Sequence, residues 1–380
     1  MENITEQFRT PIKELFGMDI SEATLHYSTR SYVYVFPTEY IIRINLDEEN
    51  ADPTVREAEL NFLSDINRYC DTVCASIPSI NKKSIEHISM DKKSYSIIKT
   101  LKAKGDIVSG PALNAHHAER VGDVLGHIHQ ASKESAQKGL TYHRPTWLTI
   151  DGVLHENIDS EAFAPYLDFA ARAKLKQTAE KVKALTPVSS INYGMIHGDF
   201  THYNYYVDGE DIWVFDFDDC QYGYYMYDIG TLFINWLLRA DAGVGLSSEE
   251  FLSQLLPAFR QGYERHMKLD ENEWNLLELF MQYRLLIMIL DSIYSLITQT
   301  GKIGGTTNTL AILPSILNPF MASDLCKGID QQAEEGRRKR EKIMQLLQNG
   351  PNPDSPEDMA MMKFLESDDM KPFIEGLLKS

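Results

Sequence analysis

Hydrophobic residues near the start of the chain change from a helical to an alternating spacing. Four of them recur every three or four positions and predict a short amphipathic helix: Phe8, Ile12, Leu15 and Phe16. Three runs rich in aromatic and β-branched residues then predict an antiparallel meander, at 25–27, 32–36 and 40–44. Two further strands are expected at 85–88 and 95–98, joined by a polar turn at 91–93.

Helical spacing returns after residue 115 and dominates the rest of the chain. The runs expected to form helices are 115–131, 160–185, 232–238, 251–266 and 274–296, whereas 139–158 is expected to be irregular. Two short apolar runs, 205–207 and 212–215, flank the turn residues Asp208 and Gly209 and predict a β-hairpin. A sheet early in the chain followed by many helices indicates the α+β class.

Composition narrows the class of protein. A chain of 380 residues is long enough to form two lobes or domains, and a net charge of −18 argues against a nucleic-acid partner. The negative charge is compatible with a cationic substrate, although simple solubility explains it equally well. No apolar run is long enough to span a membrane and no signal-peptide pattern opens the chain, so we expect no membrane partner. The four cysteines are too few for a disulfide scaffold, which favours reduced thiols in a cytoplasmic protein.

The stretch 195–230 holds the residues best suited to catalysis. Asp199 is followed five residues later by Asn204, and an acidic cluster of Asp216, Asp218 and Asp219 follows the hairpin. A hairpin between Asn204 and Asp216 would bring oxygen ligands from both of its ends to one point. Phosphoryl transfer needs one carboxylate to accept the proton of the attacking hydroxyl, and an Asn and an Asp to hold Mg²⁺ against the phosphates. We therefore assign Asp199 as the base and Asn204 and Asp216 as the metal ligands.

The motifs in this stretch, H-G-D-x-x-x-x-N, D-F-D-D and Y-D-I-G, resemble those of the aminoglycoside phosphotransferase and choline kinase-like family of small-molecule kinases. The resemblance implies the same three roles for Asp199, Asn204 and Asp216. It further implies that His197 packs beneath the catalytic loop and hydrogen-bonds to the backbone, and that Asp228 ties the following helix to that loop.

Asp218 or Asp219 would help to hold a second metal or a substrate cation. Because the loop 201–203 reads T-H-Y instead of the H-P-x of the family, the resemblance gives no information on the acceptor.

The resemblance covers about residues 20–300 and implies a protein-kinase-like fold of two lobes. Residues 1–99 would form a small N-lobe with an antiparallel sheet and one helix, which binds the nucleotide phosphates. Residues 100–325 would form a large helical C-lobe with the catalytic loop and the acceptor pocket, and residues 326–380 a helical extension. The last segment, 356–380, would dock on the C-lobe or on a second subunit, so a homodimer is one of the alternatives.

The N-lobe of this family contacts the phosphates through a turn between its first two strands. That turn is normally rich in glycine, but here it has none, and its candidates are Ser28, Thr29 and Ser31. An ordinary polar turn is an equally good interpretation. Arg43 on the third strand stands where protein kinases place a lysine, and a guanidinium can bridge a phosphate and a carboxylate.

The carboxylate partner of Arg43 is expected on the helix that begins near Pro53. Glu57 is preferred to Glu59, because Glu57 fits an R-E-x-x-x-L-like pattern of the family. By position alone, the segment from Lys99 through Leu101 to residue 106 corresponds to the hinge whose backbone binds the adenine edge.

Four histidines fall within or beside the helix expected at 115–131: His116, His117, His127 and His129. They suggest a metal site only at first sight, since the chain lacks a His pair at i, i+4 with a Glu base as in zinc peptidases. We interpret them as packing or solvated residues.

The leading hypothesis is a kinase that moves the γ-phosphate of ATP or GTP to a hydroxyl of a small, cationic or neutral acceptor with Mg²⁺. A protein Ser/Thr kinase of the same superfamily is disfavoured, because Asp228 comes only twelve residues after Asp216 and no A-P-E motif follows. A non-catalytic nucleotide-binding module is the third alternative, supported by the glycine-free turn and opposed by the intact Asp199, Asn204 and Asp216. The acceptor itself is not determined by the sequence.

Overall fold

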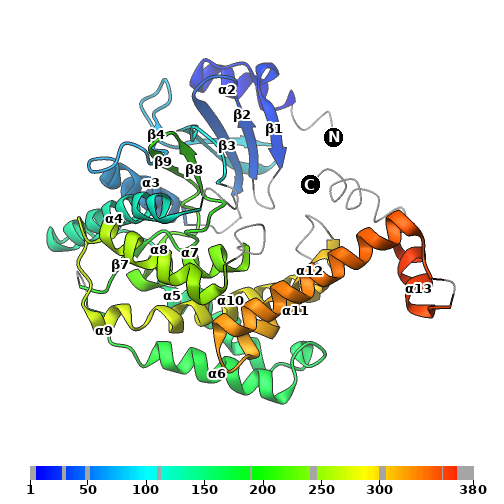
Figure 1. Cartoon of the computed structure of the whole chain (residues 1–380). Helices are drawn as coiled ribbons and strands as arrows, with labels where there is room; N and C mark the ends of the chain where they lie inside the picture. Colours follow the sequence, from blue (N-terminus) through cyan, green and yellow to red (C-terminus); the bar gives the residue numbers. More distant parts are fainter. Residues whose placement is uncertain are drawn as a thin grey trace.

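The computed structural model describes residues 6–27, 31–47, 52–108, 113–188, 191–239, 246–298, 305–352 and 354–365. An antiparallel sheet forms first and helices form most of the remainder (Figure 1), which confirms the predicted α+β class. The first part of the chain contains α2 Arg9–Phe16, β1 Thr24–Tyr27, β2 Ser31–Val35, β3 Tyr40–Asp47, α3 Pro53–Ile66, β4 Ser76–Ile77, β5 Glu86–Met90 and β6 Lys93–Leu101.

The strands of this first part pair in the order β1-β2-β3-β6-β4, with β5 also paired to β6, and each of these strand pairs is antiparallel. Side chains alternate between the two faces of a strand. On β3, Ile42 and Ile44 therefore pack beneath α2, whereas Ile41 and Arg43 face the opposite side, towards a cleft. The sheet thus has one face buried by its own helix and one face available for a ligand.

The helical part contains α4 Ala115–Gln137, α5 Trp147–Glu156, α6 Phe169–Lys183, β7 Tyr193–Ile196, β8 Tyr205–Asp208, β9 Asp211–Val214, β10 Gln221–Tyr224, α7 Tyr225–Arg239, α8 Ser248–Tyr263, α9 Glu271–Trp274, α10 Leu277–Thr298, α11 Gly305–Met321, α12 Leu325–Asn349 and α13 Pro356–Leu365. The pairs β7–β10 and β8–β9 form two small antiparallel sheets, the second being the predicted hairpin. A large apolar core joins α3, α4, α6, α7, α8 and α10.

Two of the expected elements in this part were wrong. The segment 139–158 was expected to be irregular, but it contains α5, whose start is capped by the Thr146 hydroxyl accepting from the N–H of Thr149 at 3.2 Å. The helix expected at 160–185 begins only at Phe169, because Pro165 interrupts the run and Asp168 caps the new start.

Close packing of α4 against α8 fixes the centre of the helical part. A Cβ on Gly262 of α8 would overlap the carbonyl oxygen of Glu119, and one on Gly122 of α4 would overlap that of Phe259. Glycine at these positions therefore allows the two backbones to touch.

At the C-terminal side, Lys342 of α12 pairs with Asp358 of α13 at 3.1 Å, so α13 lies beside the far end of α12 (Figure 1). Among the described helices, none combines the length and apolar character that a membrane crossing requires.

Candidate active site

A cleft of about 550 Å³ lies between the open face of the first sheet and the β8–β9 hairpin. Its sheet side is apolar, with Val33, Val35 and Ile41, and the hairpin side adds Tyr206 and Phe215. Ligand pockets in proteins span ~300–1,000 Å³ and are mostly apolar with a few placed polar groups. The acidic cluster and Arg43 also line this cleft, so one cavity combines a surface for a flat ring with charged groups at its edge.

Arg43 is the charged centre of the cleft. Its Nη2 lies 2.9 Å from Glu59 Oε1, while its Nη1 contacts Asp218 and lies 3.9 Å from Asp216 Oδ1. Burial lowers the pKa of Arg43, but the carboxylates of Glu59 and Asp218 outweigh this effect, so the net shift of its pKa is upward. The guanidinium therefore stays charged although its side chain is only 15% exposed.

The choice of Glu57 as the partner of Arg43 was wrong. Glu59 is buried on the face of α3 that meets β3, whereas Glu57 is exposed. Two helical residues that differ by two positions point about 200° apart, so only one of the pair can reach the strand. The match to the R-E-x-x-x-L-like pattern carried no information on which face of the helix is buried.

The catalytic loop that follows β7 is held by Asp228 of α7. The buried carboxylate of Asp228 accepts the N–H groups of His197 at 2.7 Å and Gly198 at 2.9 Å, and it lies 3.1 Å from His129 Nε2. The ring of His197 is buried and its Nε2 lies 3.1 Å from the carbonyl oxygen of Phe215. Asp228 thus holds the backbone of the loop, and the His197 ring also accepts the N–H of Asp199 on Nδ1 at 3.3 Å, so both side chains contact the loop backbone as the resemblance implied.

Asp199 lies near the start of this loop and has partners on both carboxylate oxygens. Oδ2 accepts from Asn204 Nδ2 at 3.0 Å, and Oδ1 contacts Arg284 Nη2 of α10. Burial lowers the pKa of Arg284, but Asp199 and the phenol of Tyr227 outweigh it, so the net shift of its pKa is upward. Because the carboxylate is 29% exposed, it remains open to a third group such as a hydroxyl.

The β8–β9 hairpin brings Asn204 and Asp216 together. Tyr205 pairs with Val214, and the N–H of Phe215 donates to the carbonyl oxygen of Asn204 at 3.0 Å. Asp216, one residue further on, has a φ of 64° and its side chain opens into the cleft. Although the side chain is 53% exposed, desolvation by the walls of the cleft and the nearby charge of Asp218 raise the pKa of Asp216 to about 6. Crowded carboxylates of this kind favour a bound cation.

The donor set near Asp216 fits a hard divalent ion. The amide of Asn204 donates from its nitrogen to Asp199, which leaves its oxygen as a ligand, and Asp216 supplies carboxylate oxygens. Asp218 is engaged by Arg43, and Asp219 lies against the loop, where a Cβ on Gly198 would overlap its carbonyl oxygen.

The remaining predicted nucleotide contacts divide into two groups. Ser31 and Leu101 line the cleft, whereas Lys99 points to the other face of the sheet, with its Nζ 5.0 Å from the ring centre of Tyr40. Alternation along β6 turns the Lys99 side chain away from the cleft, but the prediction for this segment concerned its backbone and stays a prediction. Ser28 and Thr29 lie outside the described residues.

Two functional candidates, Arg284 and Arg144, were missed from the sequence. Arg284 interrupts the apolar run of α10, and a lone charge in such a run was the available signal. Arg144 donates from Nε to the carbonyl oxygen of Cys220 at 2.6 Å and from Nη2 to that of Asp218, which fixes the acidic segment from behind. Nothing in the spacing of the sequence pointed to Arg144.

Comparisons with known proteins find similarity to phosphotransferases. The sequence model of APH, the phosphotransferase enzyme family, matches residues 102–269. Amicoumacin kinase of Bacillus subtilis (strain 168) is 24% identical over 200 residues, 52% of this chain and 57% of that protein. Homoserine kinase of Pseudomonas aeruginosa (strain UCBPP-PA14) is 29% identical over 133 residues, 34% of this chain and 40% of that protein. The chain therefore matches less than two thirds of the length of either relative.

Solved structures share the fold over most of the chain. An amicoumacin kinase bound to AMP-PNP and Ca²⁺ aligns with a TM-score of 0.66 at 20% identity, covering 83% of this chain and 92% of its own. A microcompartment-associated aminopropanol kinase aligns with a TM-score of 0.61 at 18% identity, covering 84% of this chain and 96% of its own. The expected resemblance to small-molecule phosphotransferases and the kinase-like fold are thereby confirmed.

Proposed function

We propose that this chain transfers the γ-phosphate of a nucleoside triphosphate to a hydroxyl of a small molecule. Its kinase-like fold and the segment matched by the APH phosphotransferase family support the proposal. The observation that carries the proposal is the contact of Asp199 with Asn204, with Asp216 at the facing end of the same hairpin. A carboxylate for the hydroxyl proton and two oxygen donors for a cation are what phosphoryl transfer demands of a protein.

The nucleotide would lie in the cleft between the first sheet and the hairpin. Its base would occupy the apolar part, next to Ala103, whose backbone N–H and C=O make no hydrogen bond to another described residue. Its phosphates would reach Arg43. The ion pair with Glu59 holds the Arg43 guanidinium in place and limits its movement towards the acidic cluster of Asp216, Asp218 and Asp219. The polar atoms of the cavity do not distinguish ATP from GTP.

Asn204 and Asp216 would hold Mg²⁺, which neutralises charge on the phosphates when it is bound. Asp216 is suited to this role, because its carboxylate opens into the cleft and is not consumed by a close ion pair, whereas Asp218 is paired with Arg43. Asp218 and Asp219 are proposed to shape the acidic segment rather than to bind the first metal ion.

Asp199 would orient the acceptor hydroxyl and take its proton. Its two partners, Asn204 and Arg284, fix the plane of the carboxylate and leave one side open, so a hydroxyl can approach without a rearrangement of the loop. After Asp216 the chain enters β10 and α7 within nine residues, which leaves no room there for the activation segment of a protein kinase. A small acceptor is therefore favoured over a protein substrate.

The test is Mg²⁺-dependent consumption of ATP and GTP against a panel of amino alcohols, homoserine, choline, aminoglycosides and a protein acceptor. Wild type is compared with Asp199→Asn and with the matched control Asp211→Asn. The control changes an exposed carboxylate at the turn end of the β8–β9 hairpin. We expect one small-molecule class to be phosphorylated, with turnover ~10²–10⁴-fold lower in Asp199→Asn and unchanged in Asp211→Asn. Nucleotide affinity should stay nearly the same in both variants.

Nucleotide binding without any phosphorylated acceptor, or equal turnover in Asp199→Asn and wild type, would overturn the proposal in favour of a non-catalytic nucleotide-binding module. Phosphorylation of the protein acceptor alone would replace the small-molecule assignment.

A further inference from the structure

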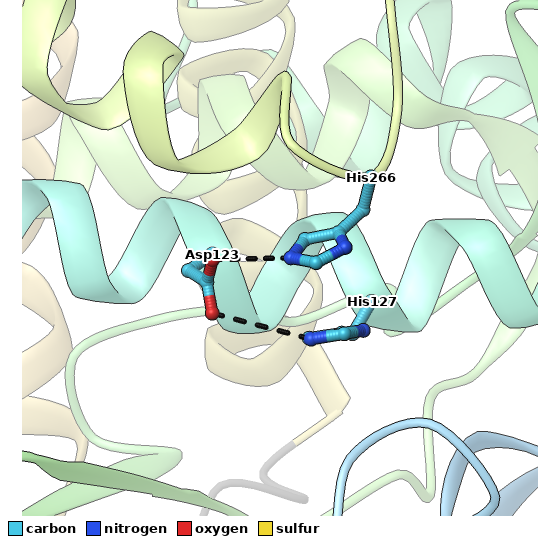
Figure 2. Close-up of side chains that lie close together, drawn as sticks. All are labelled: Asp123, His127 and His266. Carbon is cyan, nitrogen blue, oxygen red and sulfur yellow. Dashed lines mark hydrogen bonds and ion pairs between the residues drawn. The ribbon is translucent and has the colours of Figure 1, made fainter.

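Three potential metal ligands converge at the junction of α4 and the end of α8, outside the cleft (Figure 2). Asp123 and His127 stand one turn apart on α4, and His266 lies three residues beyond the end of α8. One ligand atom from each lies within 4.8 Å of the other two. Figure 2 shows both imidazole rings turned with a nitrogen towards the same carboxylate.

The distances between these atoms suit a shared ion. His266 Nε2 lies 3.0 Å from Asp123 Oδ1, and His127 Nε2 lies 4.0 Å from Asp123 Oδ2. Two ligands at ~2.0–2.1 Å from one tetrahedral Zn²⁺ lie about 3.3 Å apart, between these two values. The 4.0 Å separation is too long for a hydrogen bond but small enough for an ion to bridge.

The ring of His127 lacks the partners that a half-buried imidazole normally has. Its Nδ1 is shielded from solvent and has no hydrogen-bond partner among the described residues, and its Nε2 faces Asp123 at a distance beyond hydrogen bonding. A water would satisfy Nδ1, whereas Nε2 has no hydrogen bond to Asp123 that an ion would have to break.

The packing of the two helices positions the ligands in advance. His127 and His266 stack with ring centres 3.5 Å apart and an angle of 27°. A Cβ on Gly126 would lie 3.3 Å from both Cβ and Cδ2 of His266 and 2.8 Å from the carbonyl oxygen of Tyr263. The absence of a side chain at Gly126 is therefore what lets His266 lie on α4 beside His127.

The surrounding charges leave room for a cation. Arg265 is the nearest positive group, with its Nη1 3.1 Å from Asp123 Oδ1, but its Nη2 contacts Glu119. Glu119 therefore offsets the charge of Arg265. Arg265 can keep its ion pair with Glu119 when Asp123 binds a metal ion. Oδ2 of Asp123 remains for an ion together with the two rings.

We propose that Asp123, His127 and His266 form a binding site for a divalent transition metal ion of the zinc type, which fixes the end of α8 to α4. Two imidazoles and one carboxylate favour Zn²⁺, Co²⁺, Ni²⁺ or Cu²⁺ over Mg²⁺ and Ca²⁺, which require oxygen ligands. Partial exposure of the three side chains, between 19% and 31%, gives the ion a path in and leaves a position for water.

The site would act at a distance on the catalytic loop. Tyr263, one turn before His266, lies with its hydroxyl 2.8 Å from His129 Nδ1, and His129 contacts the Asp228 carboxylate that holds the loop. An ion that fixes the end of α8 would therefore stabilise the side chains on which the loop depends. The site itself makes no contact with the substrate and does not depend on the proposed kinase activity.

The test uses the full chain freed of metals and titrated with Zn²⁺ alone, followed by calorimetry and thermal unfolding. His127→Ala and His266→Ala are compared with the control His116→Ala, which removes an exposed histidine of the same helix paired with Glu210 at 3.0 Å. Wild type and His116→Ala should bind one more equivalent of Zn²⁺ than the two site variants. The loss of affinity should exceed ~100-fold, since loss of a mere outer partner of a metal ligand costs ~10–100-fold.

Equal Zn²⁺ stoichiometry and equal thermal stabilisation in wild type, His127→Ala and His266→Ala would overturn the proposal and reduce the trio to a hydrogen-bonded cluster. Because the variants could fail to fold, a second measurement uses the wild-type protein alone and records the absorption spectrum of bound Co²⁺. Co²⁺ added to one equivalent should give the absorption of a nitrogen- and oxygen-ligated ion, whereas a thiolate charge-transfer band, or no band, would place the ion elsewhere and refute the site.

Discussion

The replacement Glu59→Gln tests how Arg43 is held for the phosphates. Glu59 is only 5% exposed and its carboxylate lies 2.9 Å from Arg43 Nη2. Glutamine keeps the size of the side chain and an acceptor oxygen but removes the negative charge. Arg43 then stays attracted to Asp218 and Asp216, which lie on the other side of its guanidinium.

The size of the effect follows from the change in one hydrogen bond. Glutamine can still accept a hydrogen bond from the charged Arg43, but the attraction between the two opposite charges is lost, which we take as roughly 1–2 kcal/mol of positioning. This corresponds to a ~5–30-fold weaker affinity for Mg²⁺-ATP or Mg²⁺-GTP, with a similar loss of stability. The measurement is a calorimetric titration of each nucleotide, with the unfolding midpoint recorded alongside.

Glu57→Gln is the matched control, because it makes the same chemical change two positions away on the exposed face of α3. Surface substitutions usually change stability by no more than about 0.5 kcal/mol, so its nucleotide affinity should stay within about twofold of wild type. If Glu57→Gln weakened binding as much as Glu59→Gln, or if Glu59→Gln left binding unchanged, the role given to the Arg43–Glu59 pair would be refuted.

Three further predictions concern the framework of the site. Asp228→Asn should lower turnover and cost ~2–4 kcal/mol of stability by chemical unfolding, because the buried carboxylate accepts two backbone N–H groups; a variant as stable as wild type would contradict this. Gly262→Ala should destabilise by at least ~1–3 kcal/mol through overlap with the carbonyl of Glu119, whereas Gly336→Ala, in open space on α12, should be neutral or stabilise by ~1 kcal/mol; equal effects would be inconsistent with the packing. Burial lowers the pKa of His117 to about 4 from 6.5, so the unfolded chain binds more protons between these values and stability should fall as the pH drops from 6.5 to 4, by up to about 3 kcal/mol. His117→Gln should remove that part of the acid dependence, and an unchanged pH profile would argue against it.

Much of the fold followed from local patterns. The meander, the opening helix and the β8–β9 hairpin all have one apolar face, and that face leaves a period of two or 3.6 in the sequence. Prediction failed between 139 and 168, where helix α5 and the late start of α6 are decided by the capping residues Thr146 and Asp168 and by Pro165 rather than by periodicity.

The site was predictable where its residues lie close together in the chain. Asp199, Asn204 and Asp216 are separated only by a loop and a hairpin, so local geometry accounts for the contact of Asn204 with Asp199 and for Asp216 at the facing end of the hairpin. The choice of Glu59 over Glu57 depends on the rotation of α3 against β3, and the contact of Arg284 with Asp199 spans 85 positions. Tertiary packing decides such contacts, and a single sequence carries no pattern for them.

Histidines on α4 show the same limit. His127 was interpreted as a packing or solvated residue, because the chain lacks a His pair at i, i+4 with a Glu base. The proposed partner, His266, comes from the end of α8, and its approach depends on Gly126. Only the packing of the two helices reveals the cluster.

The central claim is that Asn204 and Asp216 hold a divalent ion with a nucleotide beside Asp199. Electron paramagnetic resonance of Mn²⁺, added with ATP or GTP to the protein, measures this most directly. Asp216→Asn is the variant of choice, because Asn tolerates the φ of 64° at this position, and Asp211→Asn is its control. We predict nucleotide-dependent Mn²⁺ binding in wild type and Asp211→Asn that is weakened at least ~10-fold in Asp216→Asn. Equal Mn²⁺ binding in all three proteins would contradict the account.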